Sequence, residues 1–263
     1  MKLENNTILI TGGTSGFGLE FASRLLKLGN TVIITGRNLQ KLHETKLQLP
    51  AVHIIQSDVS KAEDIEALYD QVVTKFPDLN ILINNAGEMR KLVLHDGHDL
   101  QDITREVEIN LMGPIRMVQQ FLPHLKKKKT AAILNVTSGI ALMFFPLAPV
   151  YSASKSGLRS YTQSLRVQVK NTAIKVFELV APGSPTPLND KFRDVDGFNP
   201  KMLMPADKII DAAIRGMQKD KYEIYPGLMN VFRYIIRLAP GLLLSMTSKI
   251  GAKDMYGSKI VSI

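Results

Sequence analysis

The stretch TILITGGTSGFGLEF, residues 7–21, joins a short apolar run to a glycine-rich turn and the start of an amphipathic segment. The apolar run predicts a buried strand. Gly12, Gly16 and Gly18 permit a tight turn, close approach of the backbone to a pyrophosphate and close packing of a helix on the strand. A helix that begins at Gly16 offers free N–H groups and the positive end of its dipole to an anion. The stretch therefore predicts a dinucleotide site.

Five further apolar runs follow the first, separated by amphipathic segments. Their residues are near-continuously hydrophobic, as expected of parallel strands that are buried on both faces. These runs are residues 31–35, 52–56, 80–84, 131–137 and 173–181. Because strand and helix patterns alternate without a repeat or linker, the sequence predicts an α/β fold. We expect one doubly wound (Rossmann) domain spanning residues 1–263, with a parallel sheet of about seven strands and helices on both faces.

Composition narrows the functional classes. The chain has 263 residues, no cysteine and a formal net charge of +9. The lack of cysteine excludes disulfides, thiol catalysis and cysteine-bound metal, and it fits a reducing compartment. Neither a signal peptide nor an uncharged apolar run of about 18 residues is found, so we expect a cytoplasmic protein. The positive charge suggests an anionic partner, but no long basic stripe is present, so nucleic acid is not expected.

The end of the second run bears on the choice of coenzyme. It reads TGRN at residues 35–38, where a carboxylate would bind the ribose 2′-hydroxyl of NAD and repel a 2′-phosphate. This chain has no acid there, and the guanidinium of Arg37 suits the extra phosphate. NADP(H) is therefore favoured over NAD(H). The alternative is that Arg37 is a solvated residue at the start of the next helix.

A second motif lies in VTSGIALMFFPLAPVYSASKSG, residues 136–157. Tyr151 and Lys155 are spaced i, i+4, so they share one face of a helix. A nearby ammonium, together with the positive charge of an oxidised nicotinamide, should lower the tyrosine pKa from about 10. Tyr151 is then predicted to act as general acid/base on a carbonyl or hydroxyl oxygen that Ser138 holds by a hydrogen bond.

The order of these motifs resembles the short-chain dehydrogenases/reductases (SDR) of the Tyr-x-x-x-Lys type over about residues 5–187. The first part also resembles bacterial oxidoreductases named for the lipoteichoic-acid D-alanylation operon, more weakly beyond residue 190. The motifs that carry the resemblance are TGGTSGFG at 11–18, Asp58-Val59, NNAG at 84–87, Asn110, Ser138 and YSASK at 151–155.

The resemblance implies a set of site residues. Asn110 would anchor a proton-relay water, Lys155 would bind the nicotinamide ribose, and Asp58 would bind the adenine amino group. The implied catalytic residues are Asn110, Ser138, Tyr151 and Lys155. The implied cofactor contacts are Gly12, Thr14, Ser15, Gly16, Phe17, Gly18, Arg37, Asp58, Val59, Asn85, Ala86, Gly87, Tyr151, Lys155, Pro182 and Gly183. Asn84 and Asn85 could also simply tie the fourth strand to its neighbours.

The sequence departs from the family pattern in PGSPTPL, residues 182–188. The family usually has a valine or isoleucine two residues after the glycine, and its N–H binds the nicotinamide carboxamide. Pro185 stands there and has no N–H. A one-residue deletion that aligns Thr186 with the usual threonine is the alternative. Either alignment puts the carboxamide contact in doubt.

Two further segments break the strand–helix rhythm. Residues 188–204 are polar and begin just after the sixth run, where a substrate lid or an irregular surface loop would lie. Residues 228–263 are apolar and basic, and residues 224–253 contain no acid. This C-terminal segment could contact an anionic membrane peripherally, form a subunit interface, or line an apolar substrate pocket. Burial within the protein or an oligomer is favoured, and we expect no lipid binding.

The sequence therefore predicts an NADP(H)-dependent oxidoreductase that acts on a carbonyl or alcohol group. Apolar residues near Ser138 predict a small apolar substrate; they are Met143, Phe144, Phe145 and Leu147. We expect a homo-oligomer, either a dimer or a tetramer. No metal site is predicted, because the HDGH sequence at 95–98 lacks a third ligand. The alternative function is a non-catalytic dinucleotide-binding sensor or scaffold with the same fold.

Overall fold

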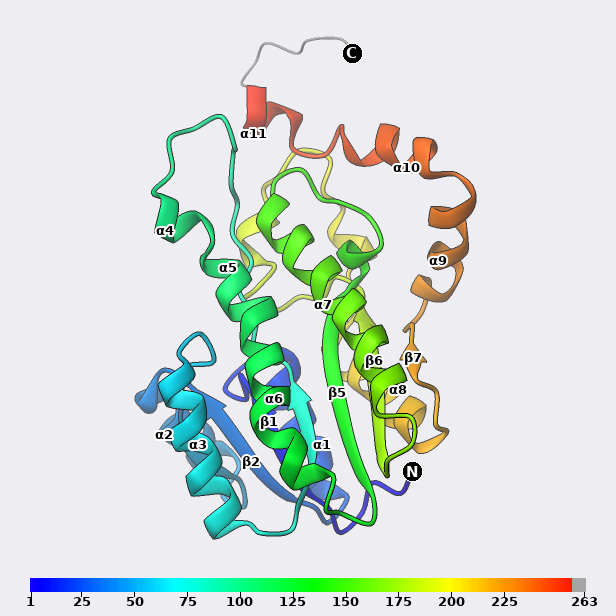
Figure 1. Ribbon diagram of the computed structural model, residues 1–263. Helices are drawn as coiled ribbons and strands as arrows, with labels where there is room; N and C mark the ends of the chain where they lie inside the picture. Colours follow the sequence, from blue (N-terminus) through cyan, green and yellow to red (C-terminus); the bar gives the residue numbers. More distant parts are fainter. Residues whose placement is uncertain (257–263) are drawn as a thin grey trace.

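The computed structural model describes residues 1–256 and contains one parallel sheet of seven strands. The strand order β3-β2-β1-β4-β5-β6-β7 is that of a doubly wound fold, which confirms the predicted fold class (Figure 1). The strands are β1 Thr7–Thr11, β2 Thr31–Gly36, β3 His53–Gln56, β4 Leu79–Asn84, β5 Ala131–Ser138, β6 Ile174–Ala181 and β7 Glu223–Ile224. The first six match the predicted runs. The seventh has only two residues and no apolar run to mark it.

Helices cover both faces of the sheet (Figure 1). The long ones are α1 Gly16–Lys27, α2 Leu39–Gln48, α3 Ala62–Lys75, α6 Gly113–Leu125, α7 Pro149–Gln168 and α8 Ala206–Gln218. Shorter ones are α4 Leu100–Ile103, α5 Arg105–Val107, the π-helical turn η1 Glu108–Met112, α9 Met229–Leu238, α10 Pro240–Thr247 and α11 Ala252–Tyr256. The lysine run 126–129 follows the end of α6, where cations complement the helix dipole.

Alternating strand side chains divide the core into two layers. On one face, Ile8 and Ile10 of β1 pack with α1 and α8. On the other, Leu9 packs with apolar residues of α3, α6 and α7. Both layers are almost fully buried, so the sheet holds the carboxyl ends of its strands in fixed positions.

A third apolar cluster includes Tyr151 and part of the segment at residues 188–204. This segment contains two short 3₁₀ turns, Asp190–Phe192 and Pro200–Met202. Phe192 is fully buried, with its ring centre 5.3 Å from that of Phe145. The segment is therefore packed onto the loop that precedes α7.

The C-terminal segment lies at the same end of the molecule as the loops that surround Tyr151 (Figure 1). Within residues 1–256, no helix is long and apolar enough to cross a membrane. Several apolar side chains of α9 are more than half exposed, so they are not buried against the rest of the chain, and the favoured burial of the segment in an oligomer stays a prediction. Residues 257–263 of the predicted segment lie outside the described residues.

Candidate active site

The glycine-rich turn after β1 packs closely on its neighbours only because it lacks side chains. Gly12 has a φ of 67°, and a Cβ on it would lie 2.8 Å from Cα of Ala86. A Cβ on Gly18 would lie 2.1 Å from the carbonyl oxygen of Gly12. Neither position tolerates a larger residue without moving the backbone. The turn thus brings the start of α1 close to the residues that follow β4.

The amino end of α1 is available to an anion. Ser15 is its N-cap residue, but the side chain makes no capping hydrogen bond, and the first turn contains no acid. Backbone N–H groups at this end therefore have no competing carboxylate. Thr14 and Phe17 flank Ser15 and Gly16 in the sequence, so all four predicted loop residues lie at this helix end.

Asn85 ties the glycine-rich turn to β4. Its side-chain amide donates to the carbonyl oxygens of Thr11 and Gly12 at 3.0 and 3.1 Å. The hydroxyl of Thr11 in turn accepts from the N–H groups of Asn85 and Ala86, both at 3.0 Å. Asn84 donates to Asn135 of β5 at 2.8 Å. The structural role considered for this asparagine pair is therefore confirmed, and it fixes residues 85–87 beside the turn.

The predicted adenine-side residues follow β2 and β3. Arg37 is exposed directly after Gly36, and it has no carboxylate partner among residues 1–256. Asp58 accepts hydrogen bonds from the N–H and hydroxyl of Ser60 at 3.0 and 2.8 Å through one carboxylate oxygen. Val59 beside it is buried. The guanidinium of Arg37 and the carboxylate of Asp58 thus follow the carboxyl ends of two neighbouring strands. Such folds bind nucleotides outside this end of the sheet.

Lys155 and Tyr151 are both buried on α7. The ammonium of Lys155 donates to the carbonyl oxygen of Val136 at 2.9 Å and lies 5.8 Å from the ring centre of Tyr151. A Cβ on Gly87 would lie 3.6 Å from the same ammonium and 3.2 Å from the side-chain oxygen of Asn110. Residues from β5, α7, η1 and the turn after β4 therefore meet at one point.

The pKa shifts are those of the protein chain without a coenzyme. Burial raises the pKa of Tyr151 to about 12, although a hydrogen bond with Ser138 acts in the opposite direction. Burial also lowers the pKa of Lys155 to about 8. In both cases the loss of hydration disfavours the charged form of the side chain. The predicted lowering of the tyrosine pKa depends on the charge of an oxidised nicotinamide as well as on Lys155, and it stays a prediction.

The side chain of Asn110 makes three hydrogen bonds that hold neighbouring segments together. It accepts from the N–H of Glu88 at 2.8 Å and donates to the carbonyl oxygen of the same residue at 2.8 Å. It also donates to the hydroxyl of Ser154 at 3.1 Å. Asn110 lies in a π-helical turn, a feature that often marks functional sites. Its amide thus clamps the segment after Gly87 against α7.

A buried ion pair near Tyr151 was not predicted. Glu106 is fully buried and accepts from the backbone N–H of Arg90 at 2.9 Å, and its other oxygen lies 3.4 Å from the Arg90 Nε. Burial raises the pKa of Glu106, whereas the bonds and charge of Arg90 lower it. The charge of Glu106 in turn raises the pKa of Tyr151. No motif or periodicity in the polar sequence around residue 106 indicates this role.

The segment after β6 is closed by its own hydrogen bonds. The carbonyl oxygen of Gly183 accepts from the N–H of Met204 at 2.8 Å, so the insert returns to its starting point. The N–H of Thr186 donates to the carbonyl oxygen of Ser184 at 2.8 Å. Because Pro185 has no N–H, it cannot make the carboxamide contact that the family pattern places there. Ser184 is buried, and its hydroxyl has no hydrogen-bond partner among the described residues.

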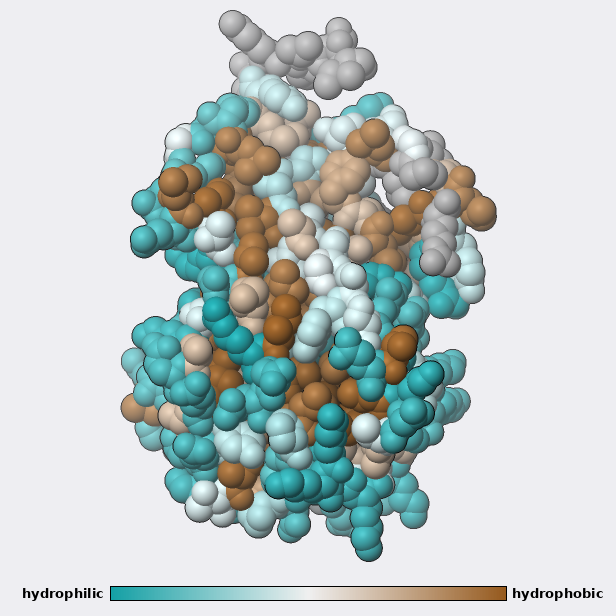
Figure 2. Space-filling view, viewed as in Figure 1, coloured by the Kyte–Doolittle hydropathy of each residue, from teal (hydrophilic) through white to brown (hydrophobic). Residues whose placement is uncertain are grey.

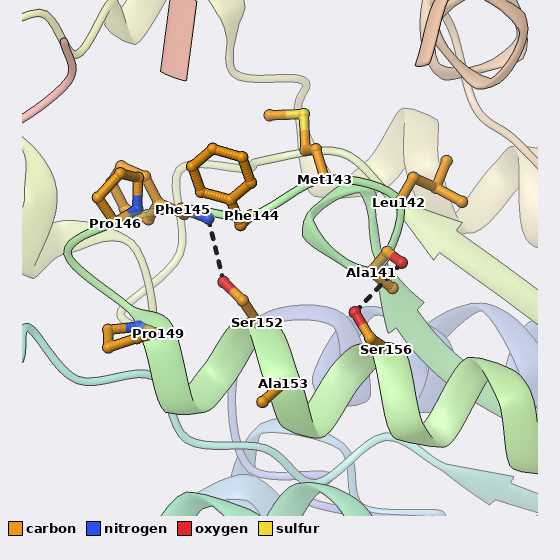
Figure 3. A pocket seen from close by; sticks show the side chains of 10 residues that line it. All are labelled: Ala141, Leu142, Met143, Phe144, Phe145, Pro146, Pro149, Ser152, Ala153 and Ser156. Carbon is orange, nitrogen blue, oxygen red and sulfur yellow. Dashed lines mark hydrogen bonds between the residues drawn. The ribbon is translucent and has the colours of Figure 1, made fainter. Parts of the chain in front are cut away.

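A cavity of about 470 Å³ has none of the predicted catalytic residues in its lining (Figure 3). It is lined by residues 141–146 and by Pro149, Ser152, Ala153 and Ser156 of α7. Phe145 N–H donates to the hydroxyl of Ser152 at 3.1 Å, and this bond fixes the loop on the helix. Figure 3 shows Met143 and Phe144 pointing away from α7.

The HDGH segment at residues 95–98, for which no metal site was predicted, lies in a loop. Within residues 1–256, no group of side chains is arranged to bind a metal ion.

Comparisons with known proteins agree with this geometry. The family described as short chain dehydrogenase matches residues 6–196. An uncharacterized oxidoreductase, DltE, of Bacillus subtilis is 42% identical over 227 residues, which cover 85% of this chain and 89% of that protein. This match confirms the predicted likeness and extends it beyond residue 190.

Solved structures share the fold. A short chain dehydrogenase from Burkholderia cenocepacia in complex with NADP has a TM-score of 0.81 at 23% identity, and the match covers 94% of this chain and 99% of that one. A 3-ketoacyl-(acyl-carrier-protein) reductase from Brucella melitensis, complexed with NADH, has a TM-score of 0.76 at 30% identity. That match covers 84% of this chain and 94% of the reductase.

Proposed function

Because the chain belongs to the short-chain dehydrogenase family, we propose that it is an NADP(H)-dependent oxidoreductase that interconverts a carbonyl and an alcohol group. The proposal rests mainly on one observation. Tyr151 and Lys155 are both buried, and Lys155 lies next to Gly87, which follows β4 beside the glycine-rich turn. A sensor or scaffold would need the turn but would not need a buried tyrosine–lysine pair beside it.

A bound nicotinamide coenzyme supplies or accepts the hydride. The hydroxyl of Tyr151 donates a proton to the carbonyl oxygen during reduction and accepts one during oxidation. The hydroxyl of Ser138 holds the same oxygen and favours the tyrosinate by hydrogen bonding. Because both side-chain N–H groups of Asn110 are already used, we assign any proton-relay water to an oxygen atom of this residue.

The positive charge of Arg37 supports NADP(H) as the preferred coenzyme. Its exposed guanidinium follows β2 and is free to pair with a 2′-phosphate. The solved structures with bound NADP and NADH carry either coenzyme on this fold, so the choice depends on this chain's own residues. Asp58, Val59 and residues 85–87 complete the proposed adenine and ribose contacts.

The substrate is proposed to be small and apolar. Tyr151 belongs to an apolar cluster with Phe145, Leu147, Phe192 and Val195, so the space next to its hydroxyl is poorly suited to a charged group. Two of these residues come from the insert at 188–204, which we assign as a substrate lid. A cytoplasmic location and a homo-oligomeric state stay predictions.

The test is oxidation of NADPH across a panel of aldehydes, ketones and acyl-carrier thioesters, with NADH for comparison. We expect turnover with at least one apolar carbonyl compound, and loss of that turnover by about a hundredfold or more in Tyr151→Phe with unchanged NADPH binding. Tyr161→Phe, a change on the same helix, is the control and should retain activity. If Tyr151→Phe matched the wild-type protein in turnover, the sensor or scaffold function would be favoured instead.

A further inference from the structure

Helix α9 exposes an apolar stripe to solvent. Its members are Leu228, Val231, Tyr234, Ile235 and Leu238, with exposed fractions of 70, 54, 55, 37 and 84%. At 100° per residue these positions share an arc of about 120° on the helix surface. Leu244 of α10 continues the exposed apolar surface and is 54% exposed. We call these six residues the α9 stripe.

The opposite side of α9 attaches the helix to the domain. Met229 packs against Gly139, the residue after Ser138, where a Cβ would lie 2.9 Å from its terminal methyl carbon. The guanidinium of Arg233 lies 4.7 Å from the ring centre of Tyr225. The α9 stripe therefore points outward from a helix that is fixed beside the proposed active site.

The sequence segment that contains the α9 stripe carries only positive side-chain charges. Residues 224–253 contain Arg233, Arg237, Lys249 and Lys253 and no acid. Arg233 lies over the ring of Tyr225 on the attached side of the helix, and Lys253 pairs with Asp196 at 3.6 Å, whereas Lys249 has no carboxylate partner within residues 1–256. An exposed apolar helix face in a basic segment without acids is the pattern of a helix that lies in the interface of an anionic bilayer.

A second copy of the chain fits this surface poorly. In a two-fold dimer the same patch meets itself, so the excess of positive charge in the segment of one copy would face the same excess in the other. The lipid interface instead offers acyl chains to the stripe and phosphates to the cations. Figure 2 shows hydrophobic side chains gathered at the end of the molecule that carries α9 and α10, while the opposite end is mostly hydrophilic.

We propose that the α9 stripe docks this protein on the surface of an anionic membrane. This reverses the expectation from the sequence that the C-terminal segment does not bind lipid. The stripe lies on the same helix as Met229, which contacts Gly139, so docking brings the surroundings of Ser138 close to the lipid. The proposal does not depend on the proposed catalytic activity.

The experiment is co-sedimentation of the full chain with vesicles of phosphatidylcholine that contain about one third phosphatidylglycerol. We expect binding that weakens with salt and is lost on pure phosphatidylcholine. The double variant Val231→Glu/Leu238→Glu should bind at least about tenfold more weakly. Its matched control, Leu47→Glu/Val167→Glu, makes the same changes at other sites that are 82 and 64% exposed and should bind like the wild-type protein.

Two outcomes would overturn the proposal. One is equal sedimentation of the wild-type protein with and without vesicles. The other is a Val231→Glu/Leu238→Glu variant that binds vesicles normally but has a smaller molar mass than the wild-type protein in light scattering, since the stripe would then be a subunit interface. Because all four positions are exposed, the variants should fold, and equal circular dichroism spectra would verify this. Turnover of a water-soluble substrate without vesicles measures the proposed catalytic function separately.

Discussion

Lys155 donates to the carbonyl oxygen of Val136 at 2.9 Å, while the same ammonium lies 5.8 Å from the ring centre of Tyr151. The lysine is therefore held by β5 rather than by the phenol. Because both side chains are buried, their charged forms are disfavoured in the protein alone. In the proposed reaction, the charge of the bound coenzyme must contribute the remaining stabilisation of the tyrosinate.

The lowered pKa of Lys155 predicts how stability depends on pH. Its pKa is about 8 in the folded chain and 10.5 in the reference state, so this residue's contribution is fully present above pH 10.5 and is lost as pH falls through 8. Between about pH 7 and pH 9.5, the free energy of unfolding should rise by about 2 kcal/mol from this group. Lys155→Met should lack this rise in urea titrations at the two pH values.

The matched control for this measurement is Lys170→Met. Lys170 is exposed just beyond the end of α7, so its removal should leave the pH dependence of the wild-type protein intact. Subtracting each variant from the wild-type protein removes the contribution of all other titrating groups. Equal pH dependence in Lys155→Met and the wild-type protein would show that the ammonium is not desolvated.

Glu106 is expected to affect the pKa of Tyr151. Its charge raises the pKa of Tyr151, so Glu106→Gln should lower that pKa and shift the pH profile of alcohol oxidation toward lower pH. A shift of a few tenths of a unit up to about one unit is expected for one neighbouring charge. The measurement is kcat as a function of pH with saturating alcohol and coenzyme.

The control is Glu108→Gln, which removes a nearby but half-exposed carboxylate paired with Arg116 at 2.9 Å. This change should leave the profile in place, because exposed charges are screened by solvent. A change of Glu106 that lowered kcat equally at every pH would instead indicate loss of structure around Arg90.

Most of the fold could be predicted because its strands are buried on both faces. β1, β2, β4, β5 and β6 are near-continuous apolar runs, and such runs have few alternative structures in a chain of this composition. β7 could not be predicted, because its two residues form an edge strand through backbone pairing with β6 alone. Its position depends on the tertiary structure rather than on a local pattern.

The residues of the candidate site also include some that the sequence could predict and some that it could not. Gly12, Gly18, Tyr151 and Lys155 stand in motifs whose spacing itself carries the geometry. The Glu106–Arg90 pair is joined only by the folding of two polar segments 16 residues apart. The raised pKa of Tyr151 in the protein alone could not be predicted, since the depth of its burial cannot be read from residue spacing.

Arg37 should decide the coenzyme preference. Arg37→Gln removes the only side-chain charge between β2 and α2, and it should raise KM for NADPH by about tenfold while KM for NADH stays unchanged. The expected loss corresponds to one charge-assisted contact with the 2′-phosphate. The measurement is initial rate against each coenzyme at fixed substrate.

Lys41→Gln is the control for Arg37, because Lys41 is also exposed and cationic but is the third residue of α2. Its KM values should match those of the wild-type protein. If KM for NADPH changed equally in both variants, the preference would reflect general positive potential rather than a contact of Arg37.

Gly18 should be required for coenzyme binding through its lack of a side chain. In Gly18→Ala the new Cβ would lie 2.1 Å from the carbonyl oxygen of Gly12 and 2.6 Å from the Asn85 side-chain nitrogen. The turn must then move away from α1 and break the bonds that Asn85 makes to it, so NADPH affinity should fall by at least about tenfold. Isothermal titration with NADPH measures this loss.

The control variant for Gly18→Ala is Gly97→Ala, which changes a loop position where an added Cβ meets no atom within 4 Å. This variant should bind NADPH like the wild-type protein. Thermal unfolding separates the two causes of a loss in Gly18→Ala. A folded variant with weak binding supports the anion-binding turn, because the strain is then confined to residues 12–18. A Gly18→Ala variant that is folded and binds NADPH normally would mean that the turn does not contact the coenzyme.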